Sequence, residues 1–166
     1  MLTAKNDRLS IAGLDIALQR IGLSHWSAET VLRSWAIAPI LVAGDRVAAP
    51  CLSDEAIWIG FWLEGDAESA TVSVTDEITG RRACKRCPES FQLTALSDGS
   101  PQPINRGPDQ AMLAFAVDVA VTNRLGEVVQ QRFQLYLLEP QAWVMESGRP
   151  APQKLTGPPP FPPRLG

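Results

Sequence analysis

The sequence is poor in the residues that most often build metal and redox sites. It holds three cysteines and one histidine. An odd number of cysteines argues against a framework of disulfides and is typical of a reducing compartment. Zinc needs about four ligands, and Cys84 and Cys87 leave only Cys51 and His25 to complete such a set. The composition therefore predicts no metal site and no cofactor.

The common catalytic motifs are also missing. The sequence has no Gly-x-Ser-x-Gly nucleophile elbow, no Gly-x-x-x-x-Gly-Lys phosphate loop and no Gly-x-Gly-x-x-Gly dinucleotide motif. His25 could act as a general base, but nothing marks a serine as its nucleophile, and no two carboxylates stand out as an acid–base pair. The sequence therefore favours a protein that is not an enzyme.

Long apolar runs and a strong charge are absent as well. No apolar run reaches the roughly 20 residues of a membrane-spanning helix. The first residues lack the basic start and apolar core of a secretion signal. We therefore expect a soluble protein in the cytoplasm, without contact to a membrane. With 15 basic and 18 acidic residues, the net charge is −3, and nucleic acid is the less favoured partner for the whole chain.

What the sequence does contain begins with a pattern typical of helices. Ile11, Leu14, Leu18 and Ile21 have the spacing of one helical face, which predicts a helix over 9–23. An N-cap and an acidic first turn predict a second, short helix that starts at Ser27 and ends near Ala36. We expect these two helices to form an N-terminal helical pair.

The remaining chain predicts strands and then a proline-rich arm. The expected class is α+β, with a helical part over 1–38 and a mainly antiparallel sheet or sandwich over 39–147. Together these parts would form a single globular domain, 1–147. The residues from 148 to 166 are rich in proline and glycine and predict an extended tail. Phe161 is the expected anchor of this tail in a groove of its own or a neighbouring subunit.

The strongest β signal is a hairpin whose loop ends in Gly126. Apolar and polar residues alternate before and after this loop, as in two strands. A three-residue loop with glycine in the left-handed region predicts Val117 opposite Phe133. The same register sets Asp118 opposite Arg132 on the other face, so charge meets opposite charge.

A second hairpin is predicted around Gly80 by the same reasoning. A three-residue loop would pair Glu77 with Arg81 and Asp76 with Arg82, two favourable pairs from one assumption. The register would also set Val74 opposite the first cysteine of the Cys-x-x-Cys segment.

Cys84 and Cys87 form the one local motif that suits a metal or redox role. Residues three apart in a strand point to opposite faces, so the two thiols should not converge unless the strand breaks at Lys85. We expect neither a bond between them nor a shared metal.

The same strand carries the one dense basic cluster of the sequence: Arg81, Arg82, Lys85 and Arg86. This cluster could bind phosphate or an acidic partner. It could equally be a solvated strand face that pairs with the acidic residues before the loop.

A candidate ligand slot lies on the apolar strand around Gly60. Trp58 and Trp62 flank this glycine on one strand face, and two indoles beside a missing side chain would suit a flat ligand or a sugar ring. Aromatic residues at this spacing are more often core, so we expect Trp58 and Trp62 to be mostly buried under the N-terminal helices, which carry Trp26 and Trp35.

One segment resembles a DNA-binding motif. Ile21–Ser24, followed by Glu29–Trp35, resembles the turn and recognition helix of excisionase-type helix-turn-helix proteins, and Val42–Pro50 resembles their wing. The resemblance implies a DNA-binding regulator, although Arg33 is the single basic residue of the implied recognition helix. The same residues fit a helical hairpin packed on the sheet.

Three functions are therefore open at the level of sequence. We favour a non-catalytic binding or assembly module whose partner is another protein or a second copy of this chain. The first alternative is the DNA-binding regulator. The second is a small-ligand-binding protein or enzyme with its pocket at Trp58, Gly60 and Trp62.

Overall fold

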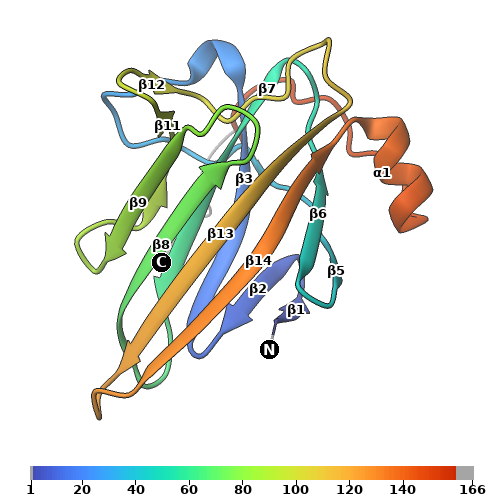
Figure 1. Cartoon of the computed structure of the whole chain (residues 1–166). Helices are drawn as coiled ribbons and strands as arrows, with labels where there is room; N and C mark the ends of the chain where they lie inside the picture. Colours follow the sequence, from blue (N-terminus) through green and yellow to red (C-terminus); the bar gives the residue numbers. More distant parts are fainter. Residues whose placement is uncertain (1, 160–166) are drawn as a thin grey trace.

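The computed structural model describes residues 2–159 and shows two β-sheets packed face to face (Figure 1). Strands make up 51% of the chain and helical residues 7%, so the protein is mostly β. The predicted α+β class is therefore wrong, and the N-terminal helical pair is not formed. The antiparallel hairpins predicted for the rest of the chain are present.

The smaller sheet is antiparallel throughout and has the order β1-β2-β3-β7-β10, with β4 paired to β3 beyond the end of β2. Its strands are β1 (Thr3–Lys5), β2 (Arg8–Ile11), β3 (Leu14–Gly22), β4 (Ala36–Ile37), β7 (Glu55–Leu63) and β10 (Gln92–Leu93).

The larger sheet has the order β12-β11-β9-β8-β13-β14-β6-β5. Its strands are β5 (Leu41–Ala43), β6 (Arg46–Pro50), β8 (Ala67–Asp76), β9 (Arg82–Cys87), β11 (Leu96–Ser97), β12 (Pro101–Gln102), β13 (Met112–Asn123) and β14 (Val128–Leu138). All its pairs are antiparallel except β14 and β6, which run parallel.

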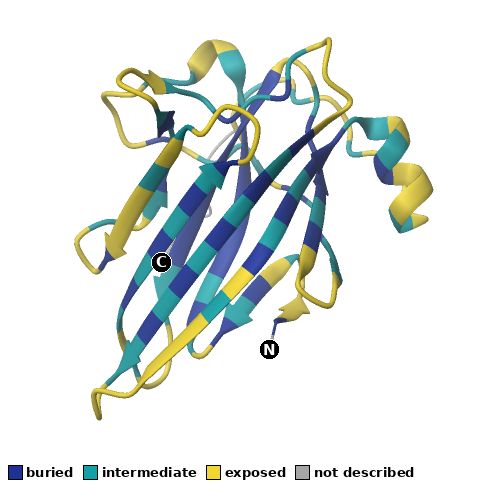
Figure 2. Cartoon of the chain, in the orientation of Figure 1, coloured by how far each residue is buried: buried dark blue, intermediate teal, exposed yellow. Residues whose placement is uncertain are grey.

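One apolar core lies between the two sheets. Figure 2 shows buried and less buried positions alternating along the strands of the larger sheet. The period of two arises because successive side chains of a strand point to opposite faces. On β13 the buried side chains are Leu113, Phe115, Val117, Val119 and Val121.

The first predicted helix, over 9–23, is instead the hairpin of β2 and β3. Ala12 and Gly13 join the two strands with φ angles of 50° and 91°. Successive positive φ angles do not occur in a right-handed helix. The helix-like spacing arises because the outer face of β3 is also covered, with Ile21 packed against Leu32 and Trp58 in a second apolar cluster.

The second predicted helix is also not formed. The chain makes one 3-10 turn, η1 (Leu23–His25), and then runs irregularly to β4. The side chain of Gln92 replaces helical hydrogen bonds here, because its amide donates to the carbonyl of Leu32 (2.7 Å) and accepts from its N–H (3.0 Å). The helix that the DNA-binding resemblance required is thus absent from this segment, and the supposed wing is the β5–β6 hairpin of the larger sheet.

The hairpin of β13 and β14 confirms the predicted register. Val117 lies opposite Phe133, and Asp118 lies opposite Arg132. The guanidinium of Arg132 donates to both oxygens of Asp118 at 2.8 and 2.9 Å. This bidentate pair lowers the pKa of Asp118 below its ordinary value. Gly126 has a φ of 80°, as the predicted loop requires.

The hairpin of β8 and β9 differs from its prediction by one residue. Its loop holds four residues instead of three, so Asp76 faces Arg81 and Val74 faces Ala83. The carboxylate of Asp76 stabilises the longer loop by accepting from the N–H groups of Ile78 (2.8 Å) and Thr79 (3.1 Å).

Helix α1 (Pro140–Ser147) follows β14 and was not predicted. Pro140 occupies its first turn, and Gly148 ends it with a φ of 68°, both of which are common helix boundaries. From residue 148 to 159 the chain has no regular secondary structure. Within the described residues, no helix is long and apolar enough to cross a bilayer.

A buried ion pair closes one end of the sandwich and holds the tail. Arg20 and Glu55 are almost fully buried, and their charged groups meet at 2.6 and 2.9 Å. The guanidinium of Arg20 also donates to the backbone carbonyl of Gln153 at 2.8 Å. The described part of the tail therefore lies on the body of its own chain.

Candidate functional site

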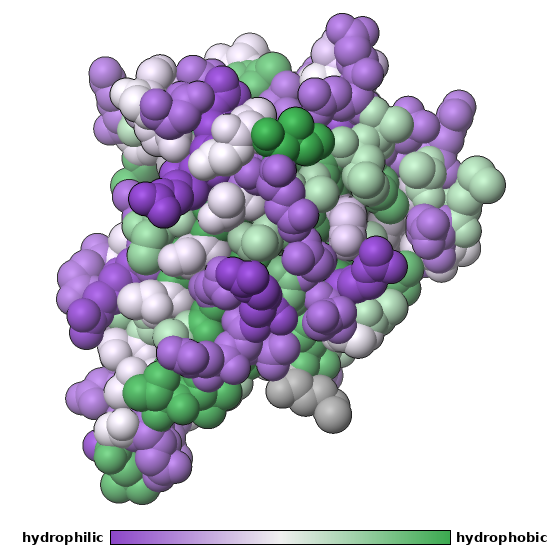
Figure 3. Space-filling model, in the orientation of Figure 1, coloured by the Kyte–Doolittle hydropathy of each residue, from purple (hydrophilic) through white to green (hydrophobic). Residues whose placement is uncertain are grey.

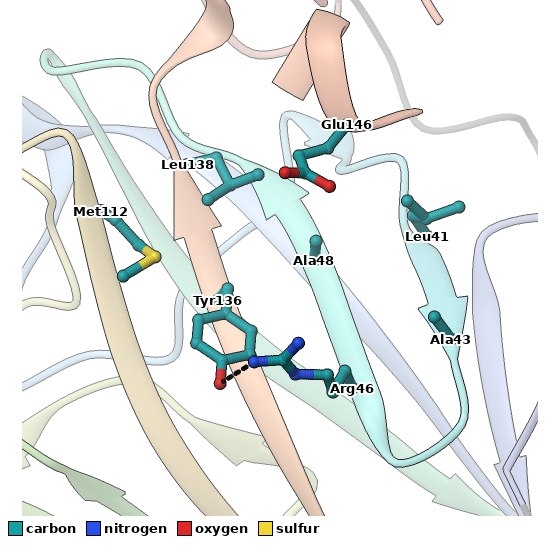
Figure 4. Close-up of a pocket in the computed structure, with 8 residues that line it drawn as sticks. All are labelled: Leu41, Ala43, Arg46, Ala48, Met112, Tyr136, Leu138 and Glu146. Atoms are coloured by element: carbon teal, nitrogen blue, oxygen red, sulfur yellow. Dashed lines mark hydrogen bonds between the residues drawn. The ribbon is translucent and has the colours of Figure 1, made fainter. Parts of the chain in front are cut away.

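A groove opens on the outer face of the larger sheet, beside helix α1 (Figure 4). Its volume is about 290 Å³. Strands β5, β6, β13 and β14 supply seven of its lining residues, and α1 supplies the eighth. The lining residues are Leu41, Ala43, Arg46, Ala48, Met112, Tyr136, Leu138 and Glu146.

The strand register explains why the face is hollowed at this place. On β6, Val47 and Ala49 are fully buried in the core, so Arg46 and Ala48 point outward. The parallel pairing sets Ala48 directly beside Tyr136 on β14. A methyl group next to a large ring leaves a step in the surface. On the other side Ala48 pairs with Leu41 of β5, which extends the floor of the groove.

A cation and an anion border this floor. The Arg46 guanidinium lies 5.2 Å from the centre of the Tyr136 ring and donates a hydrogen bond of 3.3 Å to its hydroxyl. The hydrogen bond to Tyr136 raises the pKa of Arg46 above its ordinary value. Figure 4 shows Glu146 reaching over the groove from α1, while Arg46 and Tyr136 lie on the sheet.

The groove lies near exposed apolar side chains. Met112, on its rim, has 47% of its surface exposed. The exposed apolar side chains of α1 are Val144, at 41%, and Met145, at 86%. Methionine is flexible and polarisable and therefore adapts to partners of different shape. Of these three side chains, Met112 lines the groove itself.

The tryptophan slot predicted around Gly60 is filled. A Cβ on Gly60 would lie 3.1 Å from Cζ3 of Trp58 and 3.3 Å from the side-chain nitrogen of Gln19. Trp58 is buried in the second apolar cluster, beside Trp26 and Trp35. The expected burial of Trp58 is therefore confirmed, although an irregular segment and not a helix covers it.

Trp62 is only half-buried. The guanidinium of Arg8 covers its ring at 5.1 Å from the centroid. The two tryptophans therefore lie in different surroundings, and a binding role for them stays a prediction. Phe161, the expected anchor of the tail, lies outside the described residues.

The predicted basic cluster lies on and beside β9. Arg81 pairs with Asp98 at 3.1 Å, and Arg86 pairs with Glu89 at 3.8 Å. Over the described residues, Arg82 and Lys85 have no carboxylate within ion-pair distance. A binding role for the cluster stays a prediction.

Lys85 lies on a strand with a largely unpaired outer edge. It shares the inward-facing side of β9 with Cys87, yet it is exposed. Beyond the single bridge from Arg82 to Ser97, the outer edge of β9 has no strand partner among the described residues. A lysine on such an edge opposes the addition of a further strand.

The two cysteines of β9 point to opposite faces, as predicted. Cys84 pairs with Ser73 and is exposed, whereas Cys87 pairs with Ala70 and is buried. Burial raises the pKa of the Cys87 thiol. In residues 2–159, no three side chains of His, Cys, Asp or Glu gather closely enough to hold a metal ion.

The groove is not predicted by the sequence. The available signal was the alternation along 46–50 and 133–138, which places Arg46, Ala48 and Tyr136 on one face. The pairing of the two segments, and the position of α1 over them, follow only from the fold. Comparisons with protein-family models, with curated proteins and with solved structures found no match for this chain.

Proposed function

We propose that this chain is a non-catalytic binding module, which holds a segment of a protein partner in the groove beside α1. The observation that carries the proposal is a hollow with an apolar floor, bordered by a fixed cation and an anion. Glu146 is the one carboxylate of the lining, and the lining holds no histidine, cysteine or serine. Such a set suits binding better than proton transfer or nucleophilic attack.

The chemistry of the groove defines the segment that would fit. Leu41, Ala43 and Ala48 offer an apolar surface for one large apolar side chain of the partner. A carboxylate beside that side chain would meet Arg46, and a basic group on the other side would meet Glu146. The two charges would set the orientation of the segment, while apolar burial would supply most of the affinity.

A displayed peptide library tests this proposal. Random peptides are selected on the full chain and counter-selected on the Ala48→Trp variant, whose indole would fill the groove. Ala48 is half-buried on the outer face, so the larger side chain need not enter the core. The matched control is Ala120→Trp, on the outer face of β13 near Thr71 and Gln130, away from the groove.

We expect the enriched peptides to share a large apolar residue with a charged neighbour. They should bind the wild-type chain and the Ala120→Trp control alike, and the Ala48→Trp chain at least about tenfold more weakly. A failure to enrich any peptide, or equal binding to all three chains, would contradict the proposal. Thermal melts of the three chains establish that each one is folded.

A further inference from the structure

The tip of the β13–β14 hairpin exposes apolar side chains at the end of the sheet that lies farthest from α1. Leu125, Val128 and Val129 have 83%, 56% and 45% of their surface exposed. Figure 1 shows this hairpin projecting beyond its neighbours, and Figure 3 shows apolar surface gathered near its end. Exposed apolar groups that gather on a projecting loop are typical of an interaction surface.

The tip is held in one conformation. The side-chain oxygen of Asn123 accepts from the N–H groups of Leu125 (2.9 Å) and Glu127 (3.0 Å). The N–H of Arg124 donates to the carbonyl of Asp66 at 3.1 Å, which ties the loop to the turn before β8. A loop that is already ordered loses little conformational entropy when it binds.

The charges of the tip are complementary to those of the groove. Arg124 directly precedes Leu125, and Glu127 follows it after Gly126; neither takes part in an ion pair with another described residue. The groove offers Glu146 for a basic group and Arg46 for an acidic one. The tip therefore has the composition that the groove requires: one large apolar side chain with a charge of each sign beside it.

We propose that the segment bound in the groove is the hairpin tip of a second copy of this chain, an inference that rests on the proposed function. Leu125 would cover Ala43 and Ala48, with Arg124 facing Glu146 and Glu127 facing Arg46. Tip and groove of one molecule cannot meet. Ala48 on the floor of the groove lies beside Tyr136, and eight residues of β14, or roughly 26 Å of strand, separate Tyr136 from Val128 at the tip.

A contact between two different surfaces of identical chains is head-to-tail. Each added copy leaves one free tip and one free groove, so the assembly grows as a row or closes as a ring. The proposal therefore predicts a mass that increases with protein concentration, without the limit at two copies that a symmetric dimer would show.

Complementation between two variants of the full chain tests this arrangement. Leu125→Asp removes the apolar tip and leaves the groove intact, whereas Ala48→Trp fills the groove and leaves the tip intact. Mass is measured by light scattering after size exclusion. We expect each variant alone to be a monomer and an equal mixture of the two to form a dimer that does not grow. Association of either variant alone, or a mixture that stays monomeric, would overturn the proposal.

Charge reversal provides a second, independent measurement. Arg124→Glu and Glu146→Arg should each reduce association, and the chain that carries both changes should recover it because the pair is restored with its signs exchanged. The matched control for Leu125→Asp is Val31→Asp, which changes an apolar side chain that is 85% exposed and lies outside both surfaces. Loss of association in this control as well would show that apolar contact elsewhere causes it.

The two proposals can fail separately. A wild-type chain that stays monomeric at every concentration, yet binds library peptides in the groove, would contradict the self-assembly alone. A chain that neither associates nor selects peptides would contradict both.

Discussion

The three thiols of this chain differ in their access to solvent. Cys51 is fully buried directly after β6, where burial raises its pKa to about 11. Cys87 is buried on the inner face of β9, and Cys84 is exposed on the outer face. Since the thiolate is the reactive form, both burial and a raised pKa protect a cysteine from reagents.

We therefore expect one thiol of the folded chain to react rapidly with Ellman's reagent at pH 8. The other two should react only after the chain is denatured. Absorbance of the released thiolate gives the number of groups directly. The Cys84→Ser variant is the control and should lose the rapid phase completely. A rapid phase that persists in this variant would contradict the burial of Cys51 or Cys87.

Single residues also show how far the candidate sites could be predicted. The strand around Gly60 is apolar at both parities, which correctly indicates that both of its faces are covered. The sequence could not show that an irregular segment covers this strand. The positions of Trp26, Leu32 and Trp35 in the sequence follow no regular period that would predict their packing. For Ala48 the local sequence gives no such indication. Its place in the groove depends on Tyr136 and Leu41, which the fold brings beside it.

At the scale of elements, the β13–β14 hairpin offers the most direct test of local backbone geometry. Gly126 has a φ of 80°, a region that costs a residue with a side chain about 1–2 kcal/mol. We expect Gly126→Ala to lower the free energy of unfolding by about that amount. The neighbouring Leu125→Ala change should be nearly neutral, because its side chain is 83% exposed. Urea denaturation of both variants measures the difference.

Equal stability of the Gly126→Ala variant and the wild-type chain would contradict the left-handed conformation at this loop. A large loss in Leu125→Ala would show that its side chain packs within its own molecule. The second result would also weaken the case for Leu125 as a residue that contacts another copy.

The two hairpins show why register can be predicted in one case and missed in another. In the β13–β14 hairpin, apolar pairing, charge pairing and loop length all agree on one register. In the β8–β9 hairpin, the three-residue loop gave two favourable charge pairs, yet the four-residue loop gains hydrogen bonds from Asp76 to the backbone. Those bonds depend on local geometry that pair counting does not include.

The error at the N-terminus has a different cause. Helical spacing and two-sided burial of a strand place apolar residues at overlapping positions, so Leu14, Leu18 and Ile21 fit both. The alternation of Leu14, Ile16 and Leu18, directly after Gly13, was the signal for a strand after a tight turn. It was hidden because Ile21 belongs to the second cluster, on the other face.

At the scale of the whole molecule, the chain returns to its beginning after helix α1. Arg149 pairs with Asp7 at 3.2 Å and also donates to the carbonyl of Ile40 at 3.1 Å. Further along, the carbonyl of Gln153 accepts from the buried Arg20. The tail thus links the end of the larger sheet to the first strands of the smaller one, although no residue beyond Leu137 belongs to the main core cluster.

This arrangement gives an expected result for a chain that ends at Ser147. The shortened chain should still fold, because its main core is complete, but it would lose the exposed contacts of Arg149 with Asp7 and Ile40, and Arg20 would lose the backbone acceptor of its third hydrogen bond. A hydrogen bond from a charged group contributes about 1.5–3 kcal/mol, and water that enters the opened end can replace part of it. We therefore expect a loss of about 1–3 kcal/mol in the free energy of unfolding, measured by urea denaturation.

Gln153→Ala in the full chain is the control and should be neutral, since the acceptor is a backbone carbonyl. A shortened chain as stable as the full one would show that the tail does not fasten the sandwich, and one that fails to fold would make the tail part of the core.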